Sequence, residues 1–350
     1  MYKLSNKFPF IFYFSVIFCS ISLKYDISFG YDDNFMRFSD LEINSYHLET
    51  NTENDYLGDS KTYDSGIFSS SVQMTSSSKF LNQYKMNFIS KIKYNKYSSS
   101  NQKSYGSFLS RLEFKIASYS WLKVSYSILP DYYLRTYIDR DISPLDYYPC
   151  SFSNESIYVS YSHKLPIKKT WIDYRFIFNN QFYNKHFTEY DSQIFGFEST
   201  IKSKIIKDYY LSLAYVYYDS NNISYNDSQI SESTKMDRSY IRNGLKFNIK
   251  KSFKDNIFSS IGFKFYFNQR FYDLNSWYYE TNNWKIYKDY DFRLELSKKM
   301  NNNTEIQILG RSFFRDVSSS GSNEVIWTED YKNHNRNEIW LKFIYNLSID

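Results

Sequence analysis

Polar and apolar residues alternate with a period of two along most of this chain. Between Tyr290 and Ser297 every even position is apolar and every odd position is polar. The same alternation recurs at 108–116, 172–179 and 245–250. Residues two apart in a strand share a face, whereas a helix repeats at spacings of three and four, which are not sustained after the first 22 residues. The pattern therefore predicts strands with one apolar and one polar face.

About 14 segments carry this pattern, and they run about 10 to 17 residues. Strands of soluble sandwiches usually have ~5–6 residues, whereas a strand that crosses a membrane needs ~9–11. The lengths therefore favour an all-β fold, an antiparallel transmembrane β-barrel, in which closure removes the exposed sheet edges. The expected strands cover 24–31, 66–75, 82–95, 104–117, 121–138, 154–164, 171–185, 190–204, 208–220, 240–251, 256–272, 285–298, 304–316 and 337–349.

The connections between these segments alternate in length. Outer-membrane barrels have short periplasmic turns, longer outer loops and an even number of strands, and this parity places both termini in the periplasm. The connection 186–189 is an exception, because it is short although it stands in the place of a long one. We therefore expect that one of its neighbouring strands ends or begins elsewhere than the pattern suggests. The short connections are 76–81, 118–120, 165–170, 205–207, 252–255 and 299–303, and the others are 32–65, 96–103, 139–153, 221–239, 273–284 and 317–336.

The first 22 residues have the pattern of a secretory signal peptide. Lys3 and Lys7 precede an apolar run at 8–21, and Ser20 and Ser22 are small residues at the positions that a signal peptidase reads. The run is shorter than the ~20 residues that a transmembrane helix needs, which disfavours the alternative of a membrane anchor. We therefore expect a signal peptide at 1–22 and the barrel at 23–350.

Aromatic residues make up 21% of the chain, yet its mean hydropathy is −0.59. A barrel accommodates both properties, because aromatic girdles mark the lipid boundary of its outer face. Clusters at 132–133, 209–210 and 277–279 near strand ends fit such girdles. In a soluble fold the same residues would simply favour sheet formation. The formal net charge of +5 is spread along the chain without a basic tract, so no nucleic-acid partner is expected.

Beyond the leader, the chain resembles the Gram-negative outer-membrane β-barrel class, and it is porin-like. Its last segment alternates like the closing strand that the barrel-assembly machinery reads, although it lacks a terminal aromatic residue. The stretch 29–34 resembles a Gly-Tyr-Asp-x-Asn signature of several outer-membrane barrels, including the barrel part of surface-lipoprotein assembly modifiers. The resemblance implies an integral outer-membrane protein among lipid and lipopolysaccharide. The apolar residues of the last segment are Leu341, Phe343, Tyr345, Leu347 and Ile349.

Charged residues occupy the polar face of the strands. Arg or Lys facing the middle of a bilayer costs about 2–4 kcal/mol, so these residues are expected to line the lumen. A surplus of cations over carboxylates predicts a lumen that attracts anions. In the alternative, the charges pair across strands and fill the interior. The cations expected to set a preference are Arg111, Lys115, Lys264, Arg270, Arg293, Arg311 and Arg315.

The sequence supports two classes of function. The first is a passive or substrate-selective pore for small polar solutes with a weak anion preference. The alternative is a non-conducting structural or surface-interaction barrel that acts through the outer loops 32–65, 221–239 and 317–336. The acidic loop 32–65 matches no EF-hand, so solvated carboxylates are favoured over a calcium site; folded inward, this loop would narrow the lumen.

No enzyme, cofactor or metal site is expected from the sequence. His186 lies near Asp191, and His334 lies near Asp330, as a hydrolase at the barrel rim would require. In loops rich in Asp and Asn, however, such proximity arises by chance. Cys150 is the single cysteine outside the leader, so it has no intramolecular disulfide partner and forms no Cys/His zinc motif.

Overall fold

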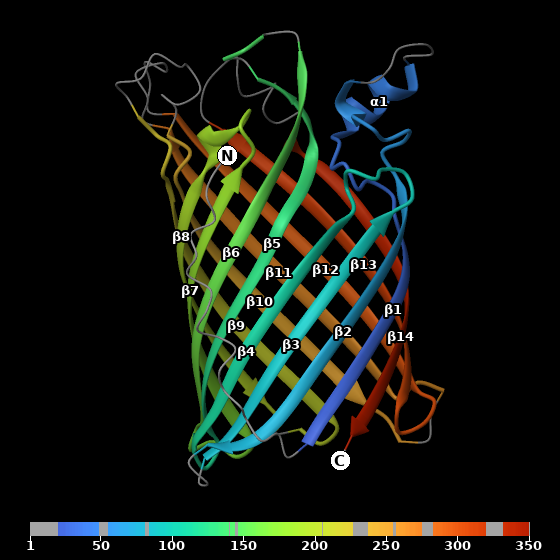
Figure 1. Ribbon diagram of the computed structural model, residues 1–350, viewed down its shortest axis with the longest axis vertical. Helices are drawn as coiled ribbons and strands as arrows, with labels where there is room; N and C mark the ends of the chain where they lie inside the picture. The colour runs from blue at the N-terminus through green and yellow to red at the C-terminus, as the bar shows by residue number, and fades with distance from the viewer. Residues whose placement is uncertain are drawn as a thin grey trace.

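The computed structural model describes residues 20–48, 55–80, 84–139, 141–143, 146–204, 206–226, 237–254, 257–274, 283–319 and 332–349. In this part of the chain, fourteen antiparallel strands form one closed barrel (Figure 1). Each strand pairs with its neighbours in sequence, and β14 closes the barrel against β1 with Ile21 opposite Ile349. The fold class and the strand count expected from the sequence are confirmed.

The strands run obliquely around the barrel wall (Figure 1). Their bounds are β1 Ser20–Asp32, β2 Ser65–Phe80, β3 Tyr84–Tyr97, β4 Tyr105–Ala117, β5 Ser120–Ile138, β6 Tyr147–Lys164, β7 Thr170–Tyr183, β8 Ser192–Ser203, β9 Tyr209–Asn222, β10 Tyr240–Ser252, β11 Ser260–Leu274, β12 Asn283–Lys299, β13 Thr304–Ser319 and β14 His334–Ile349. The helical segments are α1 Asp40–Leu48, η1 Asp55–Leu57 and η2 Thr188–Tyr190. None of the described helices is long and apolar enough to cross a membrane.

The strand ends agree with the sequence pattern to within four residues, with two exceptions: β2 ends five residues after the expected Thr75, and β6 begins seven residues before the expected Asn154. Pro149 interrupts the alternation there, and a proline is tolerated in a strand where the ladder is irregular. The facing strand β5 is irregular too, with register shifts between Leu129 and Tyr132 and between Tyr133 and Arg135. The β5–β6 hairpin therefore rises above its neighbours at one end of the barrel (Figure 1).

Large apolar side chains cover the outside of the barrel. On β3, Ile92 is 63% exposed, and on β7, Phe176 is 60% exposed. The pattern continues on β1 with Phe29 and on β14 with Ile339 and Leu341, in alternation with polar residues that face inward. A continuous exposed apolar surface of this kind marks contact with a membrane. The wall therefore presents one face to lipid and the other to the interior.

The two ends of the barrel differ in their connections. Short turns such as 118–119 and 300–303 lie at the end where β1 begins and β14 finishes, which we call the turn end. The longer connections lie at the opposite end, which we call the loop end, where α1 also lies (Figure 1). Most of the expected signal peptide falls outside the described residues, and its last three positions, 20–22, belong to β1.

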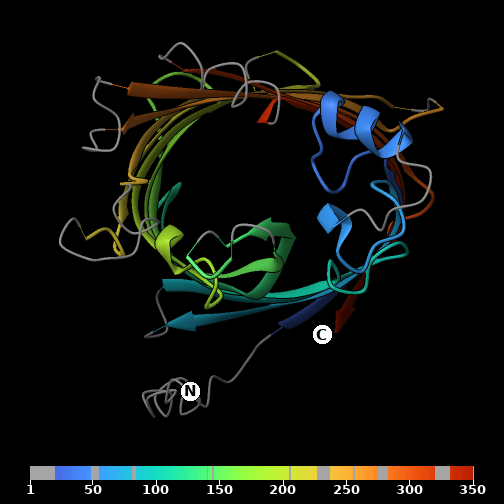
Figure 2. The same ribbon diagram turned by 90° about the horizontal axis from the view of Figure 1, so that it is seen from above.

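The first connection spans residues 33–64 between β1 and β2, and its described parts, 33–48 and 55–64, fold into the loop end of the barrel. Its apolar side chains pack against inward-facing residues of β2, β3 and β5. From above, α1 lies over one side of the rim (Figure 2). The buried residues of this cluster, here called the mouth core, are Phe35, Met36, Phe38, Leu57, Ile67, Tyr97 and Tyr133.

The mouth core corrects one expectation about the aromatic girdle. Tyr133 is 4% exposed and belongs to the mouth core inside the barrel, whereas an outer girdle was expected at 132–133. The register shifts of β5 change which residues face inward, and a strict period-two pattern cannot anticipate this. The expected cluster at 277–279 lies outside the described residues.

Gly30 on β1 faces Trp340 on β14, and a Cβ atom at this glycine would lie 2.5 Å from the indole ring. We expect Gly30→Ala to lower the free energy of unfolding by about 1–3 kcal/mol, because the ring must leave its place beside the mouth core. Gly310→Ala is the matched control, since its Cβ would meet nothing within 4 Å. Urea unfolding of the refolded barrels compares the two variants, and equal stability would contradict this role of Gly30.

Candidate functional site

The interior face of β11, β12 and β13 carries a cluster of charges around Asp289. Arg270 Nη2 donates to Asp289 Oδ2 at 3.0 Å, and Arg315 Nε donates to Asp289 Oδ1 at 2.6 Å. This carboxylate therefore lies between two guanidinium groups. Because Asp289 is only 5% exposed, it has little contact with water. We call these three residues the Asp289 cluster. It carries two cations and one carboxylate, so it leaves a positive charge on this wall.

A longer chain of ion pairs continues from β12 across β13 and β14 to β1. Asp291 binds Arg293 and Arg311, each at 2.7 Å, and Glu338 binds Arg311 at 2.6 Å. Because cations and carboxylates alternate along the wall, their charges neutralise one another. Their hydrogen bonds also hold these side chains in place on the inner face of the wall. We call the chain Arg293, Asp291, Arg311, Glu338, Arg336 and Asp32 the Asp291 chain; Arg336 pairs with Glu338 at 2.8 Å and with Asp32 at 2.5 Å.

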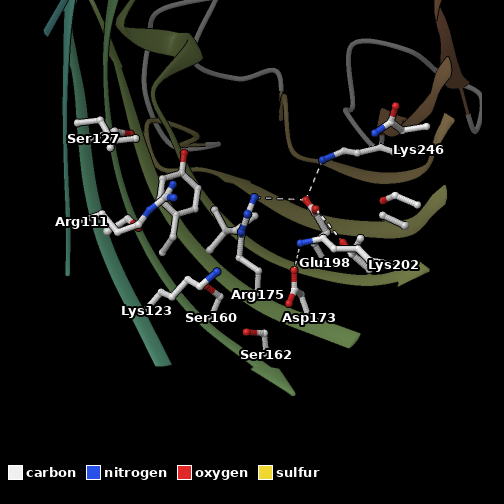
Figure 3. Close-up of a pocket in the computed structure, with 18 of the residues that line it drawn as sticks. Arg111, Lys123, Ser127, Ser160, Ser162, Asp173, Arg175, Glu198, Lys202 and Lys246 are labelled. Carbon is white, nitrogen blue, oxygen red and sulfur yellow. Dashed lines mark hydrogen bonds and ion pairs between the residues drawn. The ribbon is translucent and has the colours of Figure 1, made fainter. Parts of the chain in front are cut away.

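On the facing wall, β4 to β11 line a cavity of about 600 Å³ (Figure 3). Arg111, Lys123 and Arg175 reach into it from β4, β5 and β7. Arg111 donates to the Ser125 hydroxyl at 2.9 Å, and Glu113 lies at 3.7 Å from its guanidinium. This wall thus holds cations whose charge is only partly matched by nearby carboxylates.

A second group of charges lines the same cavity. Glu198 accepts from Lys246 at 2.7 Å and lies 3.8 Å from Arg175, and Lys202 donates to Asp173. The labelled side chains come together from β7, β8 and β10 in Figure 3. Since Lys202 and Lys246 keep about a third of their side-chain surface exposed, this wall is polar and accessible to water.

The seven cations expected in the lumen have different surroundings. Arg270 and Arg315 belong to the Asp289 cluster, and Arg293 and Arg311 belong to the Asp291 chain. Arg111 lines the cavity. The two lysines complete the set: Lys264 pairs with Glu295 at 3.0 Å, whereas Lys115 is exposed beside the short turn at 118–119. Most of these cations thus pair with carboxylates, many of them across strands, as the alternative interpretation required, but several remain partly exposed.

The carboxylates of the first connection mostly accept hydrogen bonds from the barrel. Asp59 accepts from the amides of Asn101 and Gln102 in the next outer connection, and Asp64 accepts from the Tyr31 hydroxyl at 2.6 Å. Among the described residues, no group of three or more His, Cys, Asp or Glu side chains could hold a metal ion. In the described part of the chain these carboxylates therefore hold the connection in place.

Two buried cations also hold the mouth together, and neither could be recognised from the local sequence pattern. Arg135 on β5 pairs with Glu42 of α1 at 2.9 Å. Lys103 donates to the carbonyl oxygens of Tyr133 and Leu134, each at 2.9 Å, where β5 is irregular. Burial lowers the pKa of the Lys103 ammonium to about 8.

The sequence signals that were missed are local ones. Ser39 and Glu42 form a capping box, because the Ser39 hydroxyl accepts from the Glu42 amide and the Glu42 carboxylate accepts from the Ser39 amide. The Ser-x-x-Glu spacing therefore could have located α1, which was not expected. Glu338 already lies in the expected strand 337–349, and Arg336 continues its alternation, so extending that strand by one residue would have placed both on the inward face.

In the described part of the chain, His186 does not pair with Asp191, the neighbour expected from the sequence. His186 lies 3.1 Å from Asp139 and stacks on Tyr148, and Asp191 instead accepts from the Tyr183 amide. His334 stacks on Phe313. The expected neighbour of His334 at position 330 lies outside the described residues.

No protein-family model matches the chain, and no curated protein matches it. The chain is similar to the solved structure of the outer membrane channel DcaP of Acinetobacter baumannii, with 10% identity over 93% of this chain and 97% of that chain and a TM-score of 0.47. It is also similar to OmpT, an outer membrane protein of Vibrio cholerae, with 8% identity, coverage of 93% and 97%, and a TM-score of 0.42. A third similar structure is OpdQ of Pseudomonas aeruginosa, with 10% identity, coverage of 95% and 99%, and a TM-score of 0.38.

The strand pairing of this chain itself establishes its closed fourteen-strand barrel. Its exterior is apolar, and its interior carries paired and partly exposed charges. This is the architecture of the outer-membrane β-barrel class.

Proposed function

We propose that this barrel is a pore for small polar solutes, passive or substrate-selective, in the outer membrane. The observation that carries the proposal is the partial exposure of inward-facing cations: Arg175 is 43% exposed, Lys202 35% and Arg111 33%. A charged side chain that keeps this much surface inside a closed wall requires water around it. A hydrated interior behind an apolar exterior supports a path for solutes from one end of the barrel to the other.

Export and orientation belong to the same proposal. The leader at 1–22 would direct the chain out of the cytoplasm, and the alternation through β14 supports recognition by the barrel-assembly machinery. The short connections at the turn end support a periplasmic position for that end and for both termini. The longer connections would then face outward, toward lipopolysaccharide.

The unpaired lysines of the interior support a weak anion preference. Lys91 and Lys93 on β3 and Lys123 on β5 form no ion pair with the described carboxylates, whereas most inward arginines do. Paired charges contribute little net field, so the unpaired lysines and the incompletely matched Arg111 would set the sign of the potential along the path.

Reversing these charges is expected to reverse the ion preference. In a planar bilayer under a salt gradient, the wild-type barrel should give an anion-biased reversal potential, and Arg111→Glu with Lys123→Glu should give a cation-biased one. Lys96→Glu is the control, because Lys96 lies opposite Phe68 on the outer face at the loop end. If Arg111→Glu with Lys123→Glu leaves the reversal potential unchanged, the anion preference does not arise from the wall that carries these two residues.

The non-conducting alternative is favoured by one observation, the inward folding of the first connection. The mouth core brings Phe35 and Phe38 against the inner wall, which narrows the loop end. Against this alternative, the carboxylates of the first connection bind other parts of this chain: Asp59 accepts from the Asn101 amide, and Glu42 pairs with Arg135. A correctly folded barrel that never conducts would favour the alternative.

A further inference from the structure

The cavity on the wall from β4 to β11 differs in chemistry from the facing wall. Its lining includes five cations, Arg111, Lys123, Arg175, Lys202 and Lys246, but only two carboxylates, Asp173 and Glu198. On the facing wall, the Asp291 chain and the Asp289 cluster together have five cations and four carboxylates, so the positive excess is smaller there. A negatively charged solute in the interior is therefore attracted to the cavity wall.

The positive charges are concentrated on one side of the cavity. Lys202 and Lys246 are engaged by Asp173 and Glu198, whereas Lys123 has no ion pair with a described carboxylate. Arg175 lies between Arg111 and Lys123 on one side and Glu198 on the other in Figure 3. Its guanidinium is 3.8 Å from Glu198, too long for a close ion pair, so it can turn toward an added anion.

Hydroxyl groups surround these cations. Six serine and threonine side chains line the cavity, together with three tyrosines. Hydroxyl groups both donate and accept hydrogen bonds, and Asp173 and Glu198 accept them, so the lining complements a solute that carries several hydroxyl groups of its own. The hydroxyl residues are Ser125, Ser127, Ser160, Ser162, Thr200 and Ser212, and the aromatic ones are Tyr158, Tyr218 and Tyr266.

We propose that this cavity is a binding site for a sugar-sized polyhydroxylated anion, with Arg111, Lys123 and Arg175 taking the negative group and the hydroxyl lining taking the rest. The volume of about 600 Å³ falls within the range of small-molecule sites. The inference deepens the proposed pore function by naming its substrate class. The anionic group is a carboxylate or a phosphate, both of which guanidinium groups bind.

Isothermal titration of the refolded, detergent-solubilised barrel tests the site with three probes. Glucuronate carries both the hydroxyl groups and the negative charge, glucose lacks the charge, and acetate lacks the hydroxyl groups. We expect glucuronate to bind at least about tenfold more tightly than either of the others, because only glucuronate engages both parts of the lining. Glucose 6-phosphate compares a phosphate with the carboxylate on a similar ring.

Two variants assign the binding to this cavity. Arg175→Gln and Lys123→Gln should each weaken glucuronate binding about tenfold and leave the weak binding of glucose unchanged. Lys93→Gln is the matched control, since Lys93 is an inward cation on β3 that does not line the cavity. Using two variants keeps the test decisive if one of them fails to refold, which circular dichroism would report.

Three results would overturn the inference. They are no saturable binding of glucuronate, equal binding of glucuronate and acetate, and equal loss of binding in Lys93→Gln. The failure of the pore proposal is distinguishable, because titration requires no conduction. A barrel that binds glucuronate but stays silent in a bilayer contradicts the pore and supports the site, whereas a conducting barrel without binding contradicts the site alone.

Discussion

Glu42→Gln is expected to free the first connection from the mouth of the barrel and to raise the conductance of the pore. Glu42 pairs with Arg135 at 2.9 Å, and both side chains are almost fully buried. Removing one partner of a buried ion pair leaves an uncompensated charge, which costs about 3–5 kcal/mol. The strands remain paired without this contact, so the packing of 33–64 against the wall should be lost while the barrel persists.

Two measurements would detect the release of the first connection from the mouth of the barrel. Limited proteolysis should cut the connection within 33–64 in Glu42→Gln and leave it intact in the wild type, and the single-channel conductance should increase. The double variant Glu42→Met with Arg135→Met should restore protection, since apolar side chains can join Phe38 and Tyr56, which already pack beside Arg135. Lys288→Met is the control, because its pair with Asp316 is exposed and 3.8 Å long. Unchanged proteolysis in Glu42→Gln would contradict the anchoring role.

Asp291→Asn is expected to strengthen the anion preference of the pore. Asp291 Oδ2 accepts from both Arg293 and Arg311 at 2.7 Å, so its neutralisation removes the carboxylate partner of Arg293 and leaves Arg311 paired with Glu338 alone. A unit charge at ~4 Å is worth about 1 kcal/mol in water, which corresponds to a change of about fivefold in relative ion permeability. Salt reduces the effect, so it should decrease as ionic strength rises.

The reversal potential under a salt gradient measures this change. Asp289→Asn should act in the same direction, because it frees Arg270 and Arg315. Asp316→Asn is the control: it removes a carboxylate that is 55% exposed and pairs with Lys288 outside the lumen clusters. If Asp291→Asn and Asp316→Asn shift the potential equally, the Asp291 chain does not face the conducting path.

Most of the fold could be predicted from the alternation of polar and apolar residues within single strands. Residues such as Arg311 and Asp291 could be assigned to the polar face because β12 and β13 are regular, and strand length separated a membrane barrel from a sandwich. The expected start of β6 lies seven residues too far along the chain, because Pro149 breaks the alternation and β5 and β6 pair irregularly in this region. A period-two pattern is blind to such bulges, and the inward position of Tyr133 was missed for the same reason.

The contacts that shape the interior were harder to predict. Arg336 and Asp32 are 304 residues apart in sequence and meet only because the barrel closes. The pair Glu42–Arg135 joins an outer connection to an irregular strand, so neither its partner nor its inward direction follows from local pattern. The number of lumen cations could be read from the sequence, but how many of them are neutralised depends on the register between neighbouring strands.

The most direct test of the pore is the single-channel conductance of the refolded barrel, residues 23–350, in a planar lipid bilayer with a salt gradient across it. A water-filled interior lined by Arg111, Lys123 and Arg175 predicts steady conductance steps and a reversal potential biased toward anions. A barrel that inserts and is correctly folded, yet shows no conductance above that of the lipid alone, would contradict the account.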